Sequence, residues 1–223
     1  MRIVLATGNP HKVEEMRAIF ARGGLAALGI GVVGLGDLGD PRRFREPEEH
    51  GTTFEQNATI KALSYAQQTG EWCLADDSGL EVDALGGRPG VISSHYCTDG
   101  VEQGMTREQR DQANNGRVLA ELRGVPAEGR AARFVCVMVL ASGGRVHCRS
   151  RGTFEGRIGV PPRVPAGTNG FGYDPLFLVA PEFRLTGAEL TAEEKNARSH
   201  RAAAGREISG HIAALARTLS AGA

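Results

Sequence analysis

The sequence predicts an α/β fold built on a long, mixed, twisted sheet that is flanked by helices. Strand and helix patterns alternate in the first half of the chain, as they do in parallel βα units. In the second half, a Gly143-Gly144 turn joins two strand-like segments, as in an antiparallel hairpin. With 223 residues, the chain is long enough for one large domain or for two small lobes.

The chain should begin with a strand, a turn and a helix. Residues 2–6, Arg-Ile-Val-Leu-Ala, indicate a buried strand, Asn9 is a good helix N-cap, and Pro10 suits the first helical position. Apolar side chains then recur at helical spacing until two glycines at 23–24 favour the end of the helix. A short strand and a loop should follow over residues 29–40.

A second helix and an acidic segment complete the first half. Residues 52–55, Thr-Thr-Phe-Glu, form a capping box that predicts a helix through about Gln68. The apolar residues 72–75 indicate a strand that leads directly into residues 76–79, Asp-Asp-Ser-Gly. Another short strand is expected over residues 81–83.

The second half should hold a helix, three strands and a final helix. Thr191 and Glu194 frame another capping box, which predicts the start of the last helix. The expected ranges are 106–122 for the first helix, 132–140, 145–154 and 176–179 for the strands, and about 191–219 for the last helix.

The composition argues against several classes of partner. The 26 basic and 26 acidic side chains give a formal net charge of zero, so no general attraction to nucleic acid or to an anionic membrane is expected. No apolar stretch reaches the roughly 18–20 residues that span a membrane, and the first apolar run is too short for a secretory signal. We therefore expect a cytoplasmic protein without nucleic-acid or membrane partners. Its four cysteines are expected to be free thiols.

Only three of the 26 basic residues are lysines, namely Lys12, Lys61 and Lys195. This indicates a bias that replaces exchangeable lysines by arginine. A lysine that remains can mark a place that needs a compact ammonium group, where a planar guanidinium would not fit. Chance survival is the alternative. All three lysines fall in or beside the candidate site segments.

Residues 7–12, Thr-Gly-Asn-Pro-His-Lys, join the first expected strand to the first helix. Backbone amides at a helix N-terminus attract anions, the glycine lets a phosphate approach closely, and Lys12 adds a positive charge. The second glycine and the Lys-Ser/Thr pair of a Walker A loop are missing. The segment indicates a phosphate-binding turn, although an ordinary strand–turn–helix junction explains the same residues.

Two adjacent carboxylates, Asp76 and Asp77, follow an apolar strand. They repel each other and are costly to remove from water, so their placement suggests a hard cation. Mg²⁺ prefers a few carboxylates together with the phosphate oxygens of a substrate. An ordinary Asp-Ser-Gly turn is the alternative.

Two further segments could hold a nucleotide base. Residues 171–174, Phe-Gly-Tyr-Asp, combine aromatic rings that can stack on a purine with a carboxylate that can bind its edge. Near the start of the last helix, Lys195, Ser199, His200 and Arg201 fall within about a turn and a half. A loop anchored by buried aromatic rings and an exposed polar helix face are the respective alternatives.

Taken in order, these segments resemble the inosine triphosphate pyrophosphatase family, also called the Ham1-like or dITP/XTP pyrophosphatases. The resemblance extends nearly end to end, and six modest motifs in the right order make it specific. The motifs are Thr7-Gly8-Asn9-x-x-Lys12-x-x-Glu15, Glu48-Glu49 with Gly51-x-x-Phe54-x-x-Asn57-Ala58-x-x-Lys61-Ala62, Ala75 to Leu80, Gly86-Gly87-x-Pro89-Gly90, Gly170 to Pro175, and Lys195-x-x-x-Ser199-His200-Arg201.

The resemblance implies one domain over residues 1–223, with two lobes, a central cleft and no independent second domain. It also implies a homodimer and a Mg²⁺ cofactor. Glu48 and Asp77 would bind the metal, and Asp77 would also be the catalytic base. The implied substrate-binding residues are Thr7, Gly8, Asn9, Pro10, His11 and Lys12 for the triphosphate, Lys61 and Lys195 for phosphate or sugar, Ser78 beside the metal, and Phe171, Gly172, Tyr173, Asp174, His200 and Arg201 for the purine.

The implied reaction is the hydrolysis of deaminated purine nucleoside triphosphates (ITP, dITP, XTP and dXTP) to the monophosphate and pyrophosphate. Such a reaction removes deaminated purines from the nucleotide pool. Water would attack the α-phosphorus in line, and pyrophosphate would leave. Two alternatives stay open at this point. One is a Maf-like pyrophosphatase for modified pyrimidine or methylated nucleotides, and the other is a nucleotide-binding sensor without catalysis.

Overall fold

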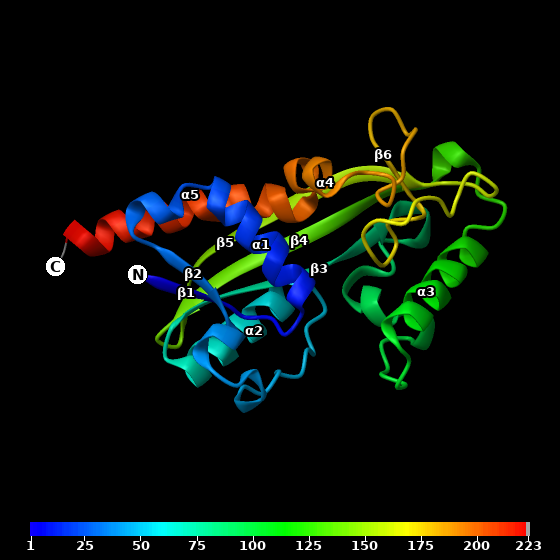
Figure 1. The fold of residues 1–223 in the computed structure, drawn as a ribbon. Coiled ribbons are helices and arrows are strands. Elements are labelled where there is room, and N and C mark those ends of the chain that lie inside the picture. Colours follow the sequence, from blue (N-terminus) through cyan, green and yellow to red (C-terminus); the bar gives the residue numbers. More distant parts are fainter. Residues whose placement is uncertain (222–223) are drawn as a thin grey trace. The chain divides into compact units, whose positions relative to one another are not determined.

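The computed structural model describes residues 1–221, without the side chains of residues 11 and 41, and it confirms a mixed α/β fold (Figure 1). Six strands form one sheet in the order β2-β1-β3-β4-β5-β6. Their bounds are β1 Arg2–Leu5, β2 Gly31–Gly34, β3 Trp72–Val82, β4 Ala131–Ser142, β5 Arg145–Ile158 and β6 Phe177–Val179. The α-helices are α1 Pro10–Arg22, α2 Phe54–Thr69, α3 Arg107–Glu121, α4 Ala192–Arg198 and α5 His200–Ala221.

The sheet is mixed because its two edges are built differently. Strand β1 pairs in parallel with both β2 and β3, as expected for strand–helix units in the first half of the chain. Strand β5 pairs antiparallel with β6, and the Gly143-Gly144 turn joins β4 to β5. Both glycines of this turn have positive φ, which suits a two-residue hairpin.

The chain forms two compact units, each made of separate segments. Unit 1 comprises residues 1–77, 136–152 and those from 200 onward, and unit 2 comprises residues 78–135 and 153–199. Each unit has its own hydrophobic core. The expectation of a single domain without an independent second one stays a prediction.

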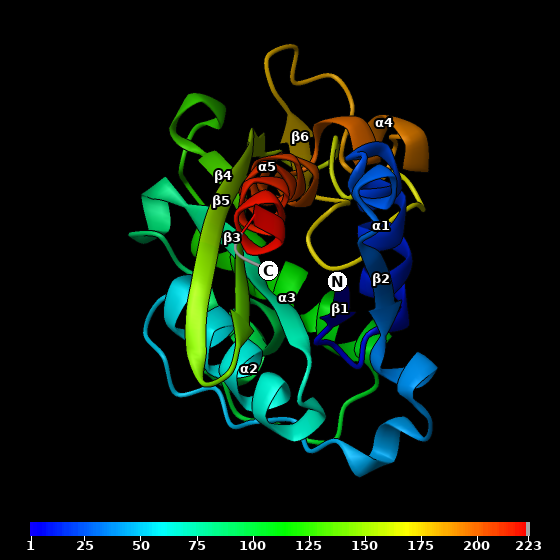
Figure 2. The ribbon, with the colours of Figure 1, turned by 90° about the vertical axis from the view of Figure 1, so that its left-hand side faces the viewer.

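In unit 1, helices α1 and α5 pack against each other and cover one face of the sheet (Figures 1 and 2). Met16 and Phe20 of α1 meet Ile208 and Ile212 of α5 there, together with side chains of β1, β3 and β4. Helix α2 lies on the other side of these strands (Figure 1). Thr53 caps α2 by accepting a hydrogen bond from the amide of Gln56, one residue later than the predicted capping box.

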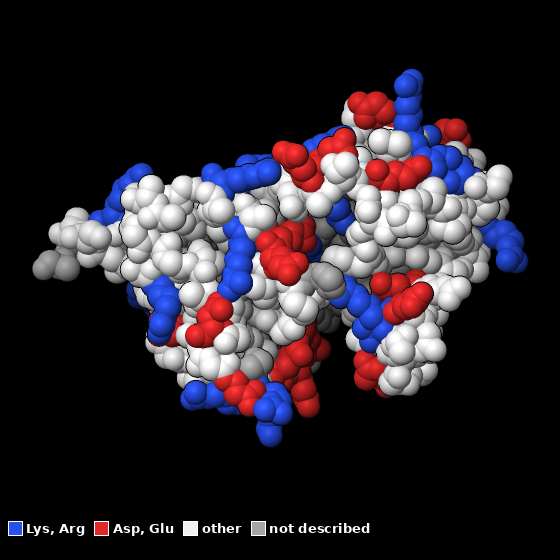
Figure 3. All heavy atoms as spheres, viewed as in Figure 1, with Lys and Arg blue, Asp and Glu red and all other residues white. Residues whose placement is uncertain are grey.

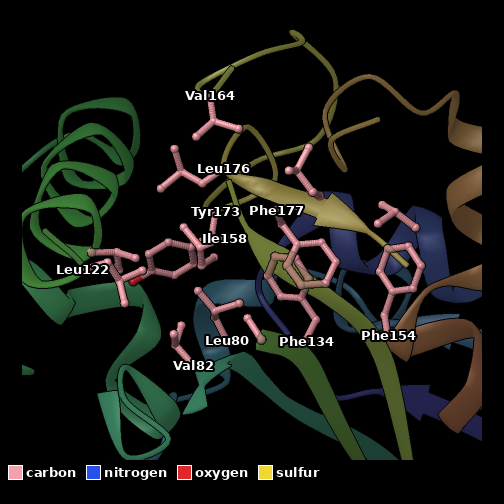
Figure 4. Packing of buried hydrophobic residues seen from close by; sticks show 14 of the residues in the cluster. Leu80, Val82, Leu122, Phe134, Phe154, Ile158, Val164, Tyr173, Leu176 and Phe177 are labelled. Atoms are coloured by element: carbon pink, nitrogen blue, oxygen red, sulfur yellow. The ribbon is translucent and has the colours of Figure 1, made fainter. Parts of the chain in front are cut away.

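The core of unit 2 is rich in aromatic rings (Figure 4). The ring of Phe177 lies 4.7 Å from that of Phe134 and 5.6 Å from that of Phe154, measured between centroids. Tyr173 is buried in the same cluster and donates a hydrogen bond from its hydroxyl to the Ser93 carbonyl, at 2.7 Å. The loop that carries Tyr173 is therefore anchored in the core.

The structure corrects two predicted elements. Strand β3 continues beyond the expected range of 72–75, so residues 76–79 do not form the alternative turn, and the strand includes most of the expected short strand at 81–83. The predicted last helix is two helices, because Ser199 adopts an extended conformation (φ −62°, ψ 159°) between α4 and α5. Capping residues alone did not show that break. Strand β5 also runs four residues further than expected, to Ile158.

The surface carries charges of both signs. Figure 3 shows acidic and basic side chains interspersed on the face in view, as the zero formal net charge suggests. Within residues 1–221, each helix is too short or too polar to serve as a transmembrane segment.

Two glycines of α5 allow a matched test of its packing. A Cβ at Gly205 would lie 2.5 Å from Cγ2 of Ile19 on α1, whereas a Cβ at Gly210 would meet no atom within 4 Å. We expect Gly205→Ala to lower the free energy of unfolding by about 1–2 kcal/mol, because overpacking outweighs the gain in helix propensity. Gly210→Ala should raise it by about 0.5–1 kcal/mol. Urea denaturation measures both, and equal effects would contradict this packing.

Candidate active site

The adjacent carboxylates Asp76 and Asp77 point to opposite faces of β3. Both are buried, and successive side chains alternate between the two faces of a strand. Asp76 contacts groups of α1 and α5, and Asp77 contacts groups of α2. The two carboxylates therefore serve two separate clusters in unit 1 instead of forming one chelating pair.

The Asp76 carboxylate lies among cations. Lys12 Nζ is 3.0 Å from its Oδ2 and 3.1 Å from its Oδ1, and Arg201 Nε is 3.4 Å from Oδ2. Arg201 Nη1 also donates to Glu15 Oε2, at 2.5 Å. Burial alone would raise the pKa of Asp76, but Lys12 and Arg201 reverse that effect and hold the pKa well below its usual range. Asp76 is thus a fixed negative charge that positions Lys12.

The Asp77 carboxylate shares one lysine with a second acid. Lys61 Nζ lies 2.8 Å from Asp77 Oδ1 and 3.0 Å from Glu49 Oε2, and Asn57 Nδ2 lies 3.4 Å from Asp77 Oδ2. Burial raises the pKa of Asp77 to about 6, because Lys61 offsets only part of this effect and Glu49 adds to it. For Lys61, burial lowers the pKa, but Asp77 and Glu49 outweigh it and raise the pKa. The cluster would accept a further cation.

The predicted phosphate turn lies between β1 and α1. The Ala6 amide donates to the Leu74 carbonyl of β3, and the Asn9 amide donates to Thr7 Oγ1, so both ends of the turn are held. Asn9 Oδ1 accepts weakly from the Lys12 amide, at 3.5 Å. A Cβ at Gly8 would meet no atom within 4 Å. The turn therefore leaves open space beside the start of a helix, which suits a bound anion.

The predicted base-binding loop belongs to unit 2. Asp174 is buried, and its Oδ2 accepts hydrogen bonds from the Phe171 amide, at 2.8 Å, and from Lys195 Nζ. Lys195 Nζ also lies 5.3 Å from the centroid of the Phe171 ring. Phe171 is half-buried, whereas Tyr173 is buried in the core. Phe171 is therefore the aromatic residue of this loop that keeps accessible ring surface.

All three lysines of the chain pair with buried aspartates. Lys12 binds Asp76, Lys61 binds Asp77, and Lys195 binds Asp174. The partners are almost fully buried. This arrangement agrees with the expectation that the remaining lysines occupy places that need a compact ammonium group.

Several predicted site residues lie together, and others do not. Lys12 and Arg201 meet at Asp76, while Lys61 meets Asp77. Arg201 and buried His200 open α5 in unit 1, whereas Lys195 and Ser199 belong to unit 2, so the predicted cluster at one helix start is divided.

Other predicted site residues make none of these ion pairs. Glu48 is exposed, and the neighbouring Glu49 is the acid that reaches Lys61. Ser78 is half-buried in β3 directly after Asp77. Pro10 is the first residue of α1, and the side chain of His11 lies outside the described part of the structure. The metal role of Glu48 stays a prediction.

Three residues of these clusters had no predicted role from the sequence: Glu15, Glu49 and Asn57. Helical spacing could have found two of them. Glu15 lies three residues after Lys12, and Asn57 lies four residues before Lys61, so each shares a helix face with a candidate lysine. Strand alternation would have separated Asp76 from Asp77 if the strand had been predicted to continue.

Comparison with known proteins identifies the family. The sequence model of the Ham1 family matches residues 3–211. This protein belongs to the Ham1 family. It is 47% identical over 206 residues to the dITP/XTP pyrophosphatase of Nitratidesulfovibrio vulgaris, with 92% of this chain and 93% of the relative covered. It is 46% identical over 202 residues to the dITP/XTP pyrophosphatase of Desulforamulus reducens, with 90% of each chain covered.

The fold of this protein is similar to those of solved Ham1 structures. A HAM1 protein from Coxiella burnetii is 38% identical, with a TM-score of 0.78, and the match covers 95% of this chain and 98% of that one. The Ham1 protein of Staphylococcus aureus is 33% identical, with a TM-score of 0.77 and the same coverage. The mixed six-stranded sheet is therefore a feature that this chain shares with Ham1 structures.

The raised pKa of Asp77 predicts a pH effect on stability in the metal-free protein. Between about pH 4, its ordinary pKa, and about pH 6, the folded state keeps a proton that the unfolded state has released. The free energy of unfolding should therefore fall as the pH rises through this window, by at most about 3 kcal/mol.

Asp77→Asn removes this titration, so the variant should gain stability relative to the wild type between pH 4 and pH 6. Urea denaturation of both proteins in the presence of a chelator measures the difference. A difference that does not change with pH would contradict the assigned pKa.

Proposed function

We propose that this protein hydrolyses deaminated purine nucleoside triphosphates (ITP, dITP, XTP and dXTP) to the monophosphate and pyrophosphate. The observation that carries the proposal is the pair of buried aspartates on opposite faces of β3, each bound to a lysine, next to the turn that opens α1. The relatives' printed name, dITP/XTP pyrophosphatase, supports the choice of substrate.

We propose Mg²⁺ as the cofactor, with Asp77 and an acid of the Glu48-Glu49 pair as its protein ligands. The donors fit this ion because all are carboxylate oxygens. Asp77 and Glu49 also share one ammonium group, that of Lys61, so the pair of carboxylates keeps negative charge for a metal cation. Among the described residues, no three Asp, Glu, His or Cys side chains group closely enough to hold a metal. Two carboxylates suit an ion that takes further oxygen ligands from the phosphates of its nucleotide. When bound, Mg²⁺ supplies positive charge to the triphosphate.

The chain's own residues have clear tasks in this reaction. Asp77 accepts the proton of the attacking water, and in the metal-free protein burial raises the pKa of its carboxyl to about 6. Lys12 and Lys61 stabilise negative charge on the phosphates, with the amides of the turn at residues 7–9. Water attacks the α-phosphorus in line, and pyrophosphate leaves. No covalent intermediate with the enzyme is needed.

Base selection belongs to residues 171–174, Lys195, His200 and Arg201 in this proposal. Donors at these positions bind the 6-oxo group of the purine, and the 6-amino group of adenine would leave them unpaired. Arg201 has a second task, since its guanidinium binds Glu15 and Asp76. It therefore holds the carboxylate that positions Lys12.

A substrate panel tests the proposed function. Pyrophosphate release with Mg²⁺ should be fastest with ITP, XTP and dITP, and slow with ATP, GTP and the pyrimidine triphosphates. A preference for modified pyrimidine or methylated nucleotides would favour a Maf-like activity. Tight nucleotide binding without pyrophosphate release would indicate a sensor.

Replacing the proposed base tests the mechanism. Asp77→Asn keeps the size of the side chain but removes both the proton acceptor and a metal ligand, so pyrophosphate release should fall by about 10³-fold or more. Circular dichroism should show an unchanged fold. Asn57→Ala is the control, because Asn57 contacts Asp77 only through a weak bond of 3.4 Å, and its activity should fall much less. Near-normal activity of Asp77→Asn contradicts the assignment.

The lysine argument predicts a penalty for a substitution that keeps the charge. In Lys12→Arg the planar guanidinium replaces a compact ammonium group that sits 3.0 Å from buried Asp76, so kcat/KM should fall by roughly tenfold or more. Arg22→Lys, at the exposed end of the same helix, should leave kcat/KM unchanged. Unchanged kinetics in Lys12→Arg would show that this lysine survived by chance.

We also propose that the protein acts as a homodimer in the cytoplasm and does not bind nucleic acid. The homodimer follows from the family resemblance. The even charge balance, 26 basic against 26 acidic residues, supports the absence of nucleic-acid binding.

A further inference from the structure

Helix α3 carries a row of polar side chains that contact the Phe171 loop. Arg107, Asp111 and Asn115 are spaced by four residues, so they share one side of the helix. Asp111 Oδ2 accepts a hydrogen bond from the Gly172 amide, at 2.9 Å, and Asn115 Nδ2 donates to the Gly172 carbonyl, at 3.0 Å. Both polar groups of the Gly172 backbone are thereby bound to α3, so the helix fixes the loop.

Arg107 contacts the aromatic ring of the same loop. Its Cζ lies 4.4 Å from the centroid of Phe171, within the range of a cation–π contact. Asp111 lies 4.0 Å from Arg107 Nε and helps to hold the guanidinium in place. Arg107 is 40% exposed in its side chain, so it stays accessible to a ligand.

Two cations therefore lie close to the half-buried Phe171 ring, namely Arg107 and Lys195. Guanidinium and ammonium groups donate hydrogen bonds and cannot accept them. A base that stacks on Phe171 consequently meets donors alone from these two side chains. Carbonyl oxygens on the base can accept from them, whereas amino groups are donors and would leave the cations unpaired.

We propose that Arg107 is a specificity-determining residue, whose guanidinium donates to the carbonyl oxygens of a purine at Phe171. This inference rests on the proposed function. The base that Arg107 would favour is a purine with oxo groups in place of amino groups. Xanthine offers two carbonyl oxygens, hypoxanthine one, and guanine one next to a 2-amino group. Arg107 thus provides a physical reason for selection against the 2-amino group of guanine.

The test compares kcat and KM for XTP, ITP, GTP and ATP in the wild type, Arg107→Ala and Arg107→Lys. For Arg107→Ala, we expect the ratio of kcat/KM for XTP to that for GTP to fall by roughly tenfold, mainly through the KM for XTP. Arg107→Lys keeps the charge but lacks the planar fork, so it should give an intermediate ratio.

Arg110→Ala is the matched control. Arg110 lies on the same helix, but its Nη1 binds Glu102, at 3.3 Å, and His95, at 3.2 Å. We expect this variant to keep the wild-type ratios. Circular dichroism and thermal melting of each variant show whether it has folded, and Arg107→Lys carries the test if Arg107→Ala has not.

The outcomes separate this inference from the proposed function. Unchanged substrate ratios in both Arg107 variants would overturn the inference while XTP hydrolysis by the wild type upholds the function. An equal loss with all four substrates would also overturn it, because it would mean that Arg107 only orients the loop. If the wild type hydrolyses neither XTP nor ITP, the proposed function fails and the inference fails with it.

Discussion

The candidate site depends on the neutralisation of buried carboxylates by cations from neighbouring helices. A buried ionised carboxylate is costly unless it is paired, so strand β3 can carry Asp76 and Asp77 only because Lys12 and Arg201 meet the first and Lys61 meets the second. These pairs also explain why the strand runs straight through a segment that looks like a turn. The same contacts fix α1, α5 and α2 to the strand that bears the candidate site.

The two clusters are not equivalent in charge. The carboxylate of Asp76 is bound by two cations, so it stays ionised and serves as a stable anchor. Asp77 shares Lys61 with Glu49, and burial raises its pKa to about 6. Because strand alternation puts adjacent residues on opposite faces, neighbouring aspartates acquire different acidities from their surroundings alone.

Much of the fold followed from the sequence, because apolar periodicity and capping residues are local signals. Helices α1, α2 and α3 and the Gly143-Gly144 hairpin lie close to where those signals put them. The continuation of β3 through residues 76–79 and the break at Ser199 were not predicted, because tertiary ion pairs and an extended residue inside a helical pattern leave no local trace. The three lysines were informative, since each pairs with a buried aspartate. The contacts of Arg107 with Phe171 could not be predicted, because 64 residues separate them in sequence.

The chain passes between its two units after residues 77, 135, 152 and 199. Neither unit is therefore a continuous piece of sequence, and unit 1 needs three separate segments to complete its core. A single recombination point in the gene therefore cannot exchange one whole unit for that of a homologous protein. Exchange of a whole unit would need several crossover points, and those after residues 77, 135 and 152 lie inside strands that both units share.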